Sequence, residues 1–437
     1  MLVSLILSGN LPDMSGGWIL DDKWTVKLKS QIDAILAHVI VVEKGAPSSL
    51  PLVHRSHDGI DYAYDLAAVN IIKSTTSHVL THKSWGAQVS ESFARKRLLE
   101  LVRALLTDRD SACESRLLAA FIADFPKAID RQTVYVPIFG VRIEGSPWKI
   151  GKVQLVNVTA EIIDAACSGT PEVCSHLLRS TIAPGTSAVY EVEAEPEKAK
   201  ELAFEETRRA IDLLRFSVIL KPELVLGKIV IALEEDINLQ PENRLIAIIP
   251  QDFASLQVHW RGATRHHVDW VLTKELIEEL DRIGFRQLSA TLGKPYAQTS
   301  EFEKALIRSV HWIANSQFQF DNENKLLSLI TSLEVLLTPK DGNPIGTAIA
   351  EAVALICSGE LTERKTIKRR LKELYRRRSS VSHGGHTAVG QSDLAELSKL
   401  AQETVLWMIG RIDDFKTLTD VFEWIENKKL GGSVATP

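Results

Sequence analysis

The stretch that decides the fold of the C-terminal region is E-R-K-T-I-K-R-R-L-K-E-L-Y-R-R-R-S-S-V-S-H-G-G-H, residues 363–386. Its first part, Glu363–Arg378, has apolar residues at helical steps and carries nine Lys or Arg against two Glu. This pattern predicts a strongly basic helix. Gly384 and Gly385 follow, and glycines at this place are expected to stop the helix. No other segment of the sequence brings a histidine, arginines and small hydroxyls so close together.

The helical phase of this segment separates its three consecutive arginines. One stripe, at steps of three and four residues, consists of Ile367, Leu371, Leu374 and Arg378. We therefore expect Arg378 to point toward the packed side of the helix, where a charge is costly without an anionic partner. Arg376 and Arg377 fall off this stripe, and we expect them to face solvent or a phosphate. Glu334, which lies among leucines upstream, is our candidate partner for Arg378.

Length and composition indicate a multidomain globular protein. A chain of 437 residues is too long for one small core, so we expect two or three domains. Its hydrophobic fraction of 45% and charged fraction of 24% are ordinary for globular proteins. The net charge of −5 argues against a general polyanion binder. Any contact with nucleic acid must therefore come from a local basic patch.

The cysteines and the apolar runs indicate a cytoplasmic protein without a membrane anchor. The four cysteines form no C-x-x-C pair, so we predict neither a zinc ribbon nor a thioredoxin-like site. Few cysteines without a framework fit a reducing cytosol. The apolar run at residues 2–7 lacks the flanks of a signal peptide. No apolar run approaches the roughly 20 residues that a membrane span needs.

The periodicity of the chain predicts an α+β fold. We expect a mostly helical N-terminal region (1–132), a middle region of sheet and helices (133–298), a helical bundle (299–430) and a frayed tail (431–437). Helices are expected at Trp24–Val42, Ser90–Leu106, Ser115–Ile129, Glu195–Leu214, Glu301–Ser316, Asn322–Leu337, Pro344–Cys357, Ser392–Ile412 and Phe415–Ile425. Strands are expected at Thr133–Ile143, Lys149–Val158, Ser187–Val192, Val225–Glu235 and Asn243–Ile249.

Two further polar clusters are candidate sites. Residues 53–58 combine two histidines, an arginine and an aspartate, but their spacing matches no known chemistry. The second cluster contains His259, His266, His267 and Asp269. Adjacent side chains diverge on a helix or a strand, so this cluster matches no common metal pattern. We read both as polar loops or strand edges, and we predict no metal and no cofactor.

At the end of the basic helix the chain resembles a known family. The segment Arg378-Ser379-Ser380-Val381-Ser382-His383 resembles the Arg-x4-His signature of the HEPN superfamily, and its flanks resemble the Apea-like HEPN branch. Tyr375 and the helix around Glu334 belong to this resemblance, which covers about residues 300–430. Arg376 and Arg377 also fit the spacing that the family permits, but helical phase and the following serine favour Arg378.

This resemblance implies a metal-independent endoribonuclease. His383 would act as general acid or base, Arg378 would neutralise the reacting phosphate, and Ser379 would orient either partner. Products would carry a 2′,3′-cyclic phosphate and a 5′-OH. The candidate substrate contacts are Arg376, Arg377, Arg370, Ser382 and His386, and the supporting residues are Glu334 and Tyr375.

The resemblance also implies partners, and it leaves alternatives open. HEPN domains generally pair, so a homodimer is expected, with two Arg-His sets facing each other. The type would be a toxin or phage-defence nuclease, with residues 1–298 receiving an unknown activator or inhibitor. One alternative is a HEPN bundle that binds RNA or a nucleotide without cutting it. Another is a helical interaction module whose basic helix docks an acidic protein. No P-loop and no G-x-S-x-G elbow is present, which disfavours those enzyme classes.

Overall fold

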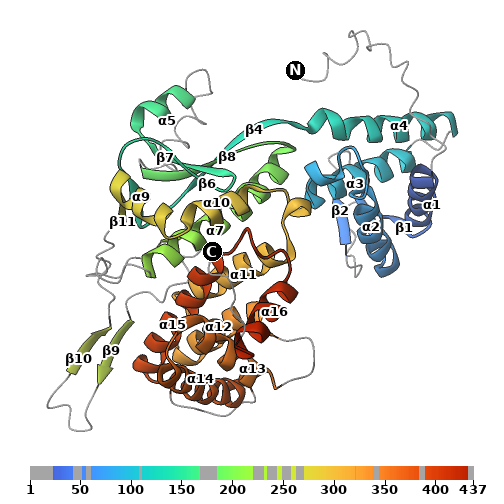
Figure 1. Ribbon diagram of the computed structural model, residues 1–437. Helices are drawn as coiled ribbons and strands as arrows, with labels where there is room; N and C mark the ends of the chain where they lie inside the picture. The colour runs from blue at the N-terminus through green and yellow to red at the C-terminus, as the bar shows by residue number, and fades with distance from the viewer. Residues whose placement is uncertain are drawn as a thin grey trace. The chain divides into compact units, whose positions relative to one another are not determined.

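The computed structural model describes residues 23–42, 52–55, 61–107, 111–167, 185–219, 231–233, 244–248, 257–261, 270–319, 321–338, 344–382 and 389–431. Within these ranges the protein has an α+β fold with a helical C-terminal region, as predicted (Figure 1). The chain divides into two compact units. The first comprises residues 1–132 and 191–202, and the second comprises residues 133–190 and 203–437. One division falls between residues 132 and 133, where the sequence also suggests a boundary, and none falls near residue 298.

The first unit packs helices against a small antiparallel sheet. Its helices are α1 (Lys23–Leu36), α2 (Leu66–Val79), α3 (Glu91–Thr107) and α4 (Ser111–Ala128). Its strands, in the order β1-β3-β2, are β1 (Val39–Val42), β3 (Asp61–Tyr64) and β2 (Leu52–Arg55). The buried ring of Trp85 stacks on Phe125 at 4.2 Å between centroids. This aromatic pair lies in a core of aliphatic and aromatic residues from the four helices and β3.

The helix predicted over Trp24–Val42 is wrong beyond Leu36. Val39–Val42 forms β1 and pairs in antiparallel register with β3, so that Val39 lies opposite Tyr64. The run Val-Ile-Val-Val is β-branched throughout, and such residues favour strands when a partner strand is present. Since a short apolar run reads equally well with either period, only the tertiary partner decides between them.

A four-stranded sheet in the order β4-β8-β7-β6 belongs mostly to the second unit, since only residues 130–132 of β4 and 191–194 of β8 are counted in the first. These strands are β4 (Asp130–Pro137), β8 (Gly185–Ala194), β7 (Val153–Val158) and β6 (Trp148–Ile150). Gly151, between β6 and β7, has a positive φ of 58°, and a Cβ there would lie 2.8 Å from Leu292. Glycine therefore permits both the turn and the close approach of α10. The helices of this part are α5 (Ala160–Cys167), α7 (Pro196–Ile219), α9 (Lys274–Arg282) and α10 (Phe285–Gly293).

The remaining strands form two small pairs. β5 (Val141–Ile143) pairs in parallel with β11 (Trp270–Leu272), and β9 (Arg244–Ile248) pairs antiparallel with β10 (Gln257–Arg261). β9 confirms the strand predicted at Asn243–Ile249. Of the strand predicted at Val225–Glu235, the structure describes residues 231–233, where Ala232 forms an isolated bridge with Phe139.

The C-terminal helices of the second unit form a bundle, as the helical stripes predicted. They are α11 (Glu301–Ser316), α12 (Asn322–Leu337), α13 (Ile345–Cys357), α14 (Leu361–Ser382), α15 (Gln391–Ile409) and α16 (Leu418–Lys429). α11 begins with a capping box between Ser300 and Glu303, which satisfies two free backbone N–H groups. Burying each leucine of α12 contributes about 1.5–3 kcal/mol. The most deeply buried of these are Leu326, Leu333, Leu336 and Leu337.

Two differences from the sequence-based expectation bear on the site. α14 continues to Ser382, one turn beyond its predicted end at Arg378, so Ser379 still belongs to the helix. The 3₁₀ segment η3 (Tyr296–Gln298), which was not predicted from the sequence, lies between α10 and α11. Among the residues that the structure describes, no helix is long and apolar enough to cross a membrane.

Candidate functional site on the basic helix

α14 buries one apolar stripe and presents charged residues on its other faces. Leu371 and Leu374 are 2% and 0% exposed, which fixes the rotation of the helix against its neighbours. In the bundle α14 packs against α13 and α12 (Figure 1). Because the apolar stripe is narrow and the helix is rich in cations, every other side of α14 must present Lys or Arg. What these cations meet differs from one face to the next.

On the packed face, Arg378 meets the carboxylate predicted to be its partner. Its Nη2 lies 3.2 Å from Oε2 of Glu334 on α12. The hydroxyl of Tyr375 donates a hydrogen bond of 2.8 Å to Oε1 of the same carboxylate. Glu334 is 18% exposed at its side chain and Arg378 is 30% exposed, so the pair is half-buried. The guanidinium is thus held in place while part of it still faces solvent.

Tyr375 connects this pair to the neighbouring helix. Burial, together with its hydrogen bond to Glu334, raises the pKa of Tyr375 to about 12. The phenol therefore stays protonated and donates at neutral pH. Its ring packs against Gly346 in the first turn of α13, where a Cβ would lie 2.4 Å from the ring. Gly346 leaves the room that brings Tyr375 between α12 and α13. We refer to Glu334, Tyr375 and Arg378 as the arginine cluster.

A second face of α14 is neutralised by carboxylates. Arg370 pairs with Glu396 at 2.8 Å, with Glu373 at 2.9 Å and also with Asp393. Arg377 pairs with Glu373 at 2.7 Å and with Asp393 at 2.5 Å. The backbone N–H of Gly390, and then Arg370 and Arg377, lower the pKa of Asp393. Asp393 belongs to the first turn of α15, so this network ties α14 to α15.

This network bears on the role expected of two residues, whose contact with substrate stays a prediction. We predicted that Arg370 and Arg377 contact substrate, yet both guanidinium groups already bind two or three carboxylates. A phosphate would have to compete with these anions at the same donors. The geometry favours a structural role for both arginines. Sequence phase could not show this, because Asp393 and Glu396 lie on another helix.

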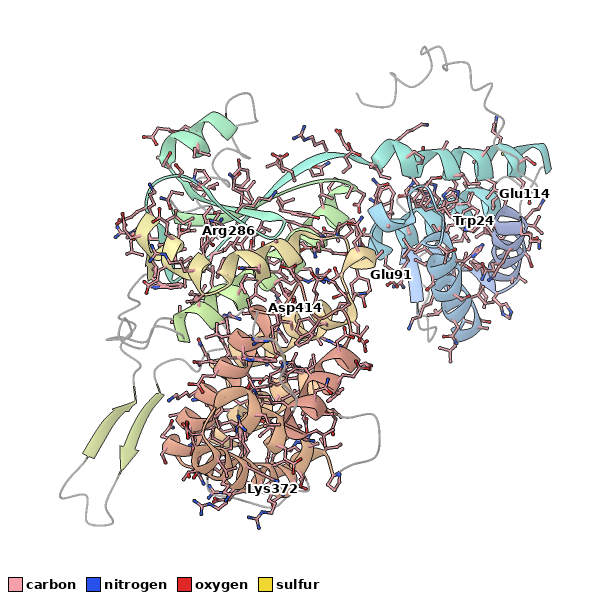
Figure 2. The ribbon with its side chains drawn as sticks, viewed as in Figure 1. Trp24, Glu91, Glu114, Arg286, Lys372 and Asp414 are labelled. Carbon is pink, nitrogen blue, oxygen red and sulfur yellow. The ribbon has the colours of Figure 1, made fainter. Side chains whose placement is uncertain are left out.

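On the third face, four cations at steps of four, three and four residues form a stripe: Lys365, Arg369, Lys372 and Arg376. They line a cavity of about 700 Å³ together with Lys368, Tyr375 and residues 344–347 at the start of α13. Lys368 pairs with Glu351 at 2.6 Å. No carboxylate of the described ranges pairs with the four stripe residues. Figure 2 labels Lys372, which belongs to this basic stripe.

The basic stripe and the arginine cluster adjoin each other, because Tyr375 of the cluster lines the same cavity as the stripe. Of the candidate substrate contacts, Arg376 lies on the stripe and is exposed. Ser379 is half-buried in the last turn of α14. Ser382 ends α14, and its side chain lies outside the description. His383 and His386 lie outside the described residues, so the expected meeting of Arg378 with His383 stays a prediction.

Sequence reasoning missed Lys365, Arg369 and Lys372 as site residues. It counted the charges of the helix without assigning them to faces. Spacing gave no signal that separates the two sets, because Glu373 stands at helical spacing from Arg369 and Arg376 of the stripe as well as from Arg370 and Arg377.

No cofactor or metal site emerges from these residues. Across the described ranges, no group of three or more His, Cys, Asp or Glu side chains could hold a metal ion. His259 lies in β10, whereas His266, His267 and Asp269 of the same polar cluster lie outside the described residues, as do residues 56–58 of the first cluster. What the α14 region offers is fixed positive charge beside a held arginine. That combination suits a phosphodiester backbone.

Comparison with known proteins adds no assignment. No protein-family model matches this chain, and neither the curated proteins nor the solved structures include a significant match.

Proposed function

We propose that this protein is a metal-independent endoribonuclease of the HEPN type, with its site at the C-terminal end of α14. The supporting observation is that the arginine cluster and the basic stripe lie next to each other on α14. The arginine cluster holds one half-exposed guanidinium, and the basic stripe beside it carries four unpaired cations within the described residues. In the sequence, His383 follows α14 directly. The site thus combines phosphate-binding charge with a nearby group that titrates near neutral pH.

In the proposed reaction the 2′-OH of the RNA attacks the adjacent phosphorus. His383 takes the proton of the 2′-OH, and the bond from phosphorus to the 5′ oxygen breaks. The leaving oxygen takes up a proton, which gives a 2′,3′-cyclic phosphate and a 5′-OH. Arg378 stabilises the phosphorane as its charge grows. Glu334 and Tyr375 keep Arg378 oriented, while Ser379 provides a hydroxyl one residue further along the helix.

The basic stripe has a separate role in this proposal. Lys365, Arg369, Lys372 and Arg376 would bind successive backbone phosphates and position the strand without reading its sequence. At the basic stripe, a phosphate does not have to displace a carboxylate of the described residues. At Arg370 and Arg377 it would have to displace Glu373. RNA affinity should therefore depend on the stripe and be sensitive to salt.

The wider setting of the proposal is a toxin or phage-defence nuclease of the cytoplasm that acts as a homodimer. Helix geometry alone does not place Arg378 and His383 of one copy on the same face. Pairing of two bundles would let the Arg378 of one copy act with the His383 of the other. Residues 1–298 would carry the regulatory part, to which an activator or inhibitor binds.

The decisive test is RNA cleavage in EDTA. End-labelled single-stranded RNA is incubated with the wild type, Arg378→Ala and His383→Ala, and with Lys399→Ala, which removes an exposed lysine of α15, as a control. The proposal expects cyclic phosphate ends from the wild type and the control and none from the two site variants. Cleavage that persists in both site variants, or that needs a metal, would contradict it.

One alternative has a specific observation in its favour. The basic stripe can bind RNA whether or not His383 reacts, so a bundle that binds RNA without cutting it also fits the unpaired cations. This second candidate expects no cleavage by any protein in the set, together with binding that Lys372→Ala weakens. Binding measured by fluorescence anisotropy on the same RNA distinguishes the two functions.

A further inference from the structure

A second cavity lies in the same unit, away from the residues used above. It has a volume of about 460 Å³ and is lined by α7, the end of α10, η3 and α11, with Lys152 from the turn between β6 and β7. This volume lies within the range of small-molecule sites, about 300–1,000 Å³. The proposed ribonuclease chemistry uses none of its residues.

One part of this cavity is apolar and aromatic. Leu213, Leu292, Ile307 and Val310 contribute aliphatic surface. Tyr296 of η3 lines the cavity with a side chain that is 77% exposed, and Nζ of Lys304 lies 4.0 Å from the centre of its ring. An exposed tyrosine at the mouth of a cavity offers a flat face for stacking. The cavity can therefore bind an apolar or flat group.

The rest of the lining is strongly cationic. Six cations line the cavity: Lys152, Arg208, Arg209, Lys294, Lys304 and Arg308. Glu205 and Asp212 also line it, and Glu206 and Glu303 neutralise Lys152, Arg209 and Lys294 from its edge. Lys304 and Arg308 pair with no carboxylate in the described part of the chain, so positive charge remains in the lining. Arg308 is also exposed.

A histidine held by a buried carboxylate completes the lining. Nδ1 of His311 lies 2.7 Å from Oδ2 of Asp212, whose side chain is 12% exposed. Asp212 is itself 3.4 Å from Nη1 of Arg215, and Nε of Arg215 donates to the carbonyl of Ile231 at 2.8 Å. Since Nδ1 donates to the carboxylate, Nε2 is the nitrogen left to interact with a ligand. The hydrogen bond to Asp212 raises the pKa of His311.

We propose that this cavity binds a small phosphorylated ligand that carries a flat ring, the class to which mononucleotides belong. Arg308 and His311 bind the phosphate, because a guanidinium fork and an imidazolium donate charge-assisted hydrogen bonds to its oxygens. The ring lies on Tyr296 and the aliphatic wall. A cationic lining with an apolar wall and a volume of about 460 Å³ suits a small anion better than a long polyanion. This site does not depend on RNA cleavage by α14.

The test is isothermal titration calorimetry on the full chain. The probes are AMP, GMP, CMP and UMP, with adenosine, inorganic phosphate and a ten-nucleotide RNA as separate arms. At least one mononucleotide is expected to bind to a single saturable site, more tightly than adenosine and inorganic phosphate by tenfold or more. Arg308→Ala and His311→Gln should each weaken that binding at least tenfold, whereas Lys399→Ala should leave it unchanged.

Three results would overturn the proposal. The first is that no mononucleotide binds, and the second is that inorganic phosphate alone binds as tightly. The third is that the RNA binds through Arg308 while mononucleotides do not. Tyr296→Ala provides a variant that cannot disturb the core, since its side chain is 77% exposed. It should weaken the mononucleotide and leave any binding of inorganic phosphate unchanged. Thermal melting of each variant checks that it is folded.

Discussion

The basic stripe of α14 and the cavity beside α11 are both rich in cations, but they are built differently. Lys365, Arg369, Lys372 and Arg376 come from one helix and meet no carboxylate of the described residues. The cations of the cavity come from segments far apart in the sequence, and Glu206 neutralises Lys152 and Arg209 among them. A third set, Arg370 and Arg377, is fully engaged by carboxylates.

The comparison shows that pairing, and not the number of cations, decides what a basic surface can bind. An open row of unpaired charges attracts a polyanion, and its affinity falls steeply with salt. A cavity that combines cations with an apolar wall selects a small ligand by shape as well as charge. For arginines that are already paired, the loss of a carboxylate partner is expected to destabilise the fold.

The largest effect is expected at the arginine cluster. Arg378→Ala should lower the rate of RNA cleavage by about 10²–10³-fold, because a positioned cation that stabilises the reacting phosphate is lost. Single-turnover cleavage of labelled RNA measures this, with Lys399→Ala as the matched control. A loss of less than fivefold in a folded Arg378→Ala protein would place the chemistry elsewhere.

The next largest effect is expected on the paired face of α14. Asp393→Asn should lower the free energy of unfolding by about 1–3 kcal/mol, since Arg370 and Arg377 lose their shared partner. Urea unfolding followed by circular dichroism measures the difference. If the variant is as stable as the wild type, these ion pairs do not tie α14 to α15.

This difference in stability should depend on pH. The pKa of Asp393 is lowered in the folded protein from 3.8, first by the backbone N–H of Gly390 and then by Arg370 and Arg377. A lowered pKa contributes stability that is fully present above the unfolded value and is lost as the pH falls through the folded value. The wild type and Asp393→Asn should therefore converge in stability below pH 3.8. Curves that stay parallel down to that range would show that the charge of Asp393 is not responsible.

A smaller effect separates the stripe from the paired face. Lys372→Ala combined with Arg376→Ala should weaken RNA binding by about tenfold at low salt and reduce the slope of log K against log salt by roughly 1 to 2. Arg377→Ala, on the paired face, should change RNA affinity by less than about twofold. Fluorescence anisotropy across a salt series measures both. If the double variant and Arg377→Ala lose RNA affinity equally, the basic stripe and the paired face do not differ in RNA binding.

The smallest effect is expected from pH at the cavity. Asp212 raises the pKa of His311 above 6.5, and Asp212 and Arg215 from α7 and Arg308 from α11 are the charged groups around it. Above pH 7 the phosphate of AMP is already fully charged, so a rise in pH there changes only the histidine. AMP affinity should fall by about threefold as His311 loses its proton. The profile should be flat for His311→Gln, and a slope of equal size in that variant would exclude His311 as its cause.

Much of the fold followed from the spacing of apolar residues. The stripes of α11 and α12 predicted those helices to the residue, because fully buried faces leave an unambiguous helical period. Residues 39–42 were misread for the opposite reason, since four consecutive β-branched or apolar residues fit either period. Beyond Arg378, α14 continued for one more turn, through serines that are weak helix formers by themselves.

For the site, the sequence by itself determined which chemical groups are present and how helical phase separates Arg378 from Arg376 and Arg377. Helical phase placed Arg378 on the packed side, where a charge is costly without an anionic partner, and Glu334 was the hypothesis for that partner. Only the tertiary structure decided which cations are neutralised, since Asp393, Glu396 and Glu351 reach α14 from other helices. The pairing of His311 with Asp212 was likewise beyond sequence reasoning. Those residues are 99 positions apart, and hydrogen bonds over such separations depend on how the helices pack.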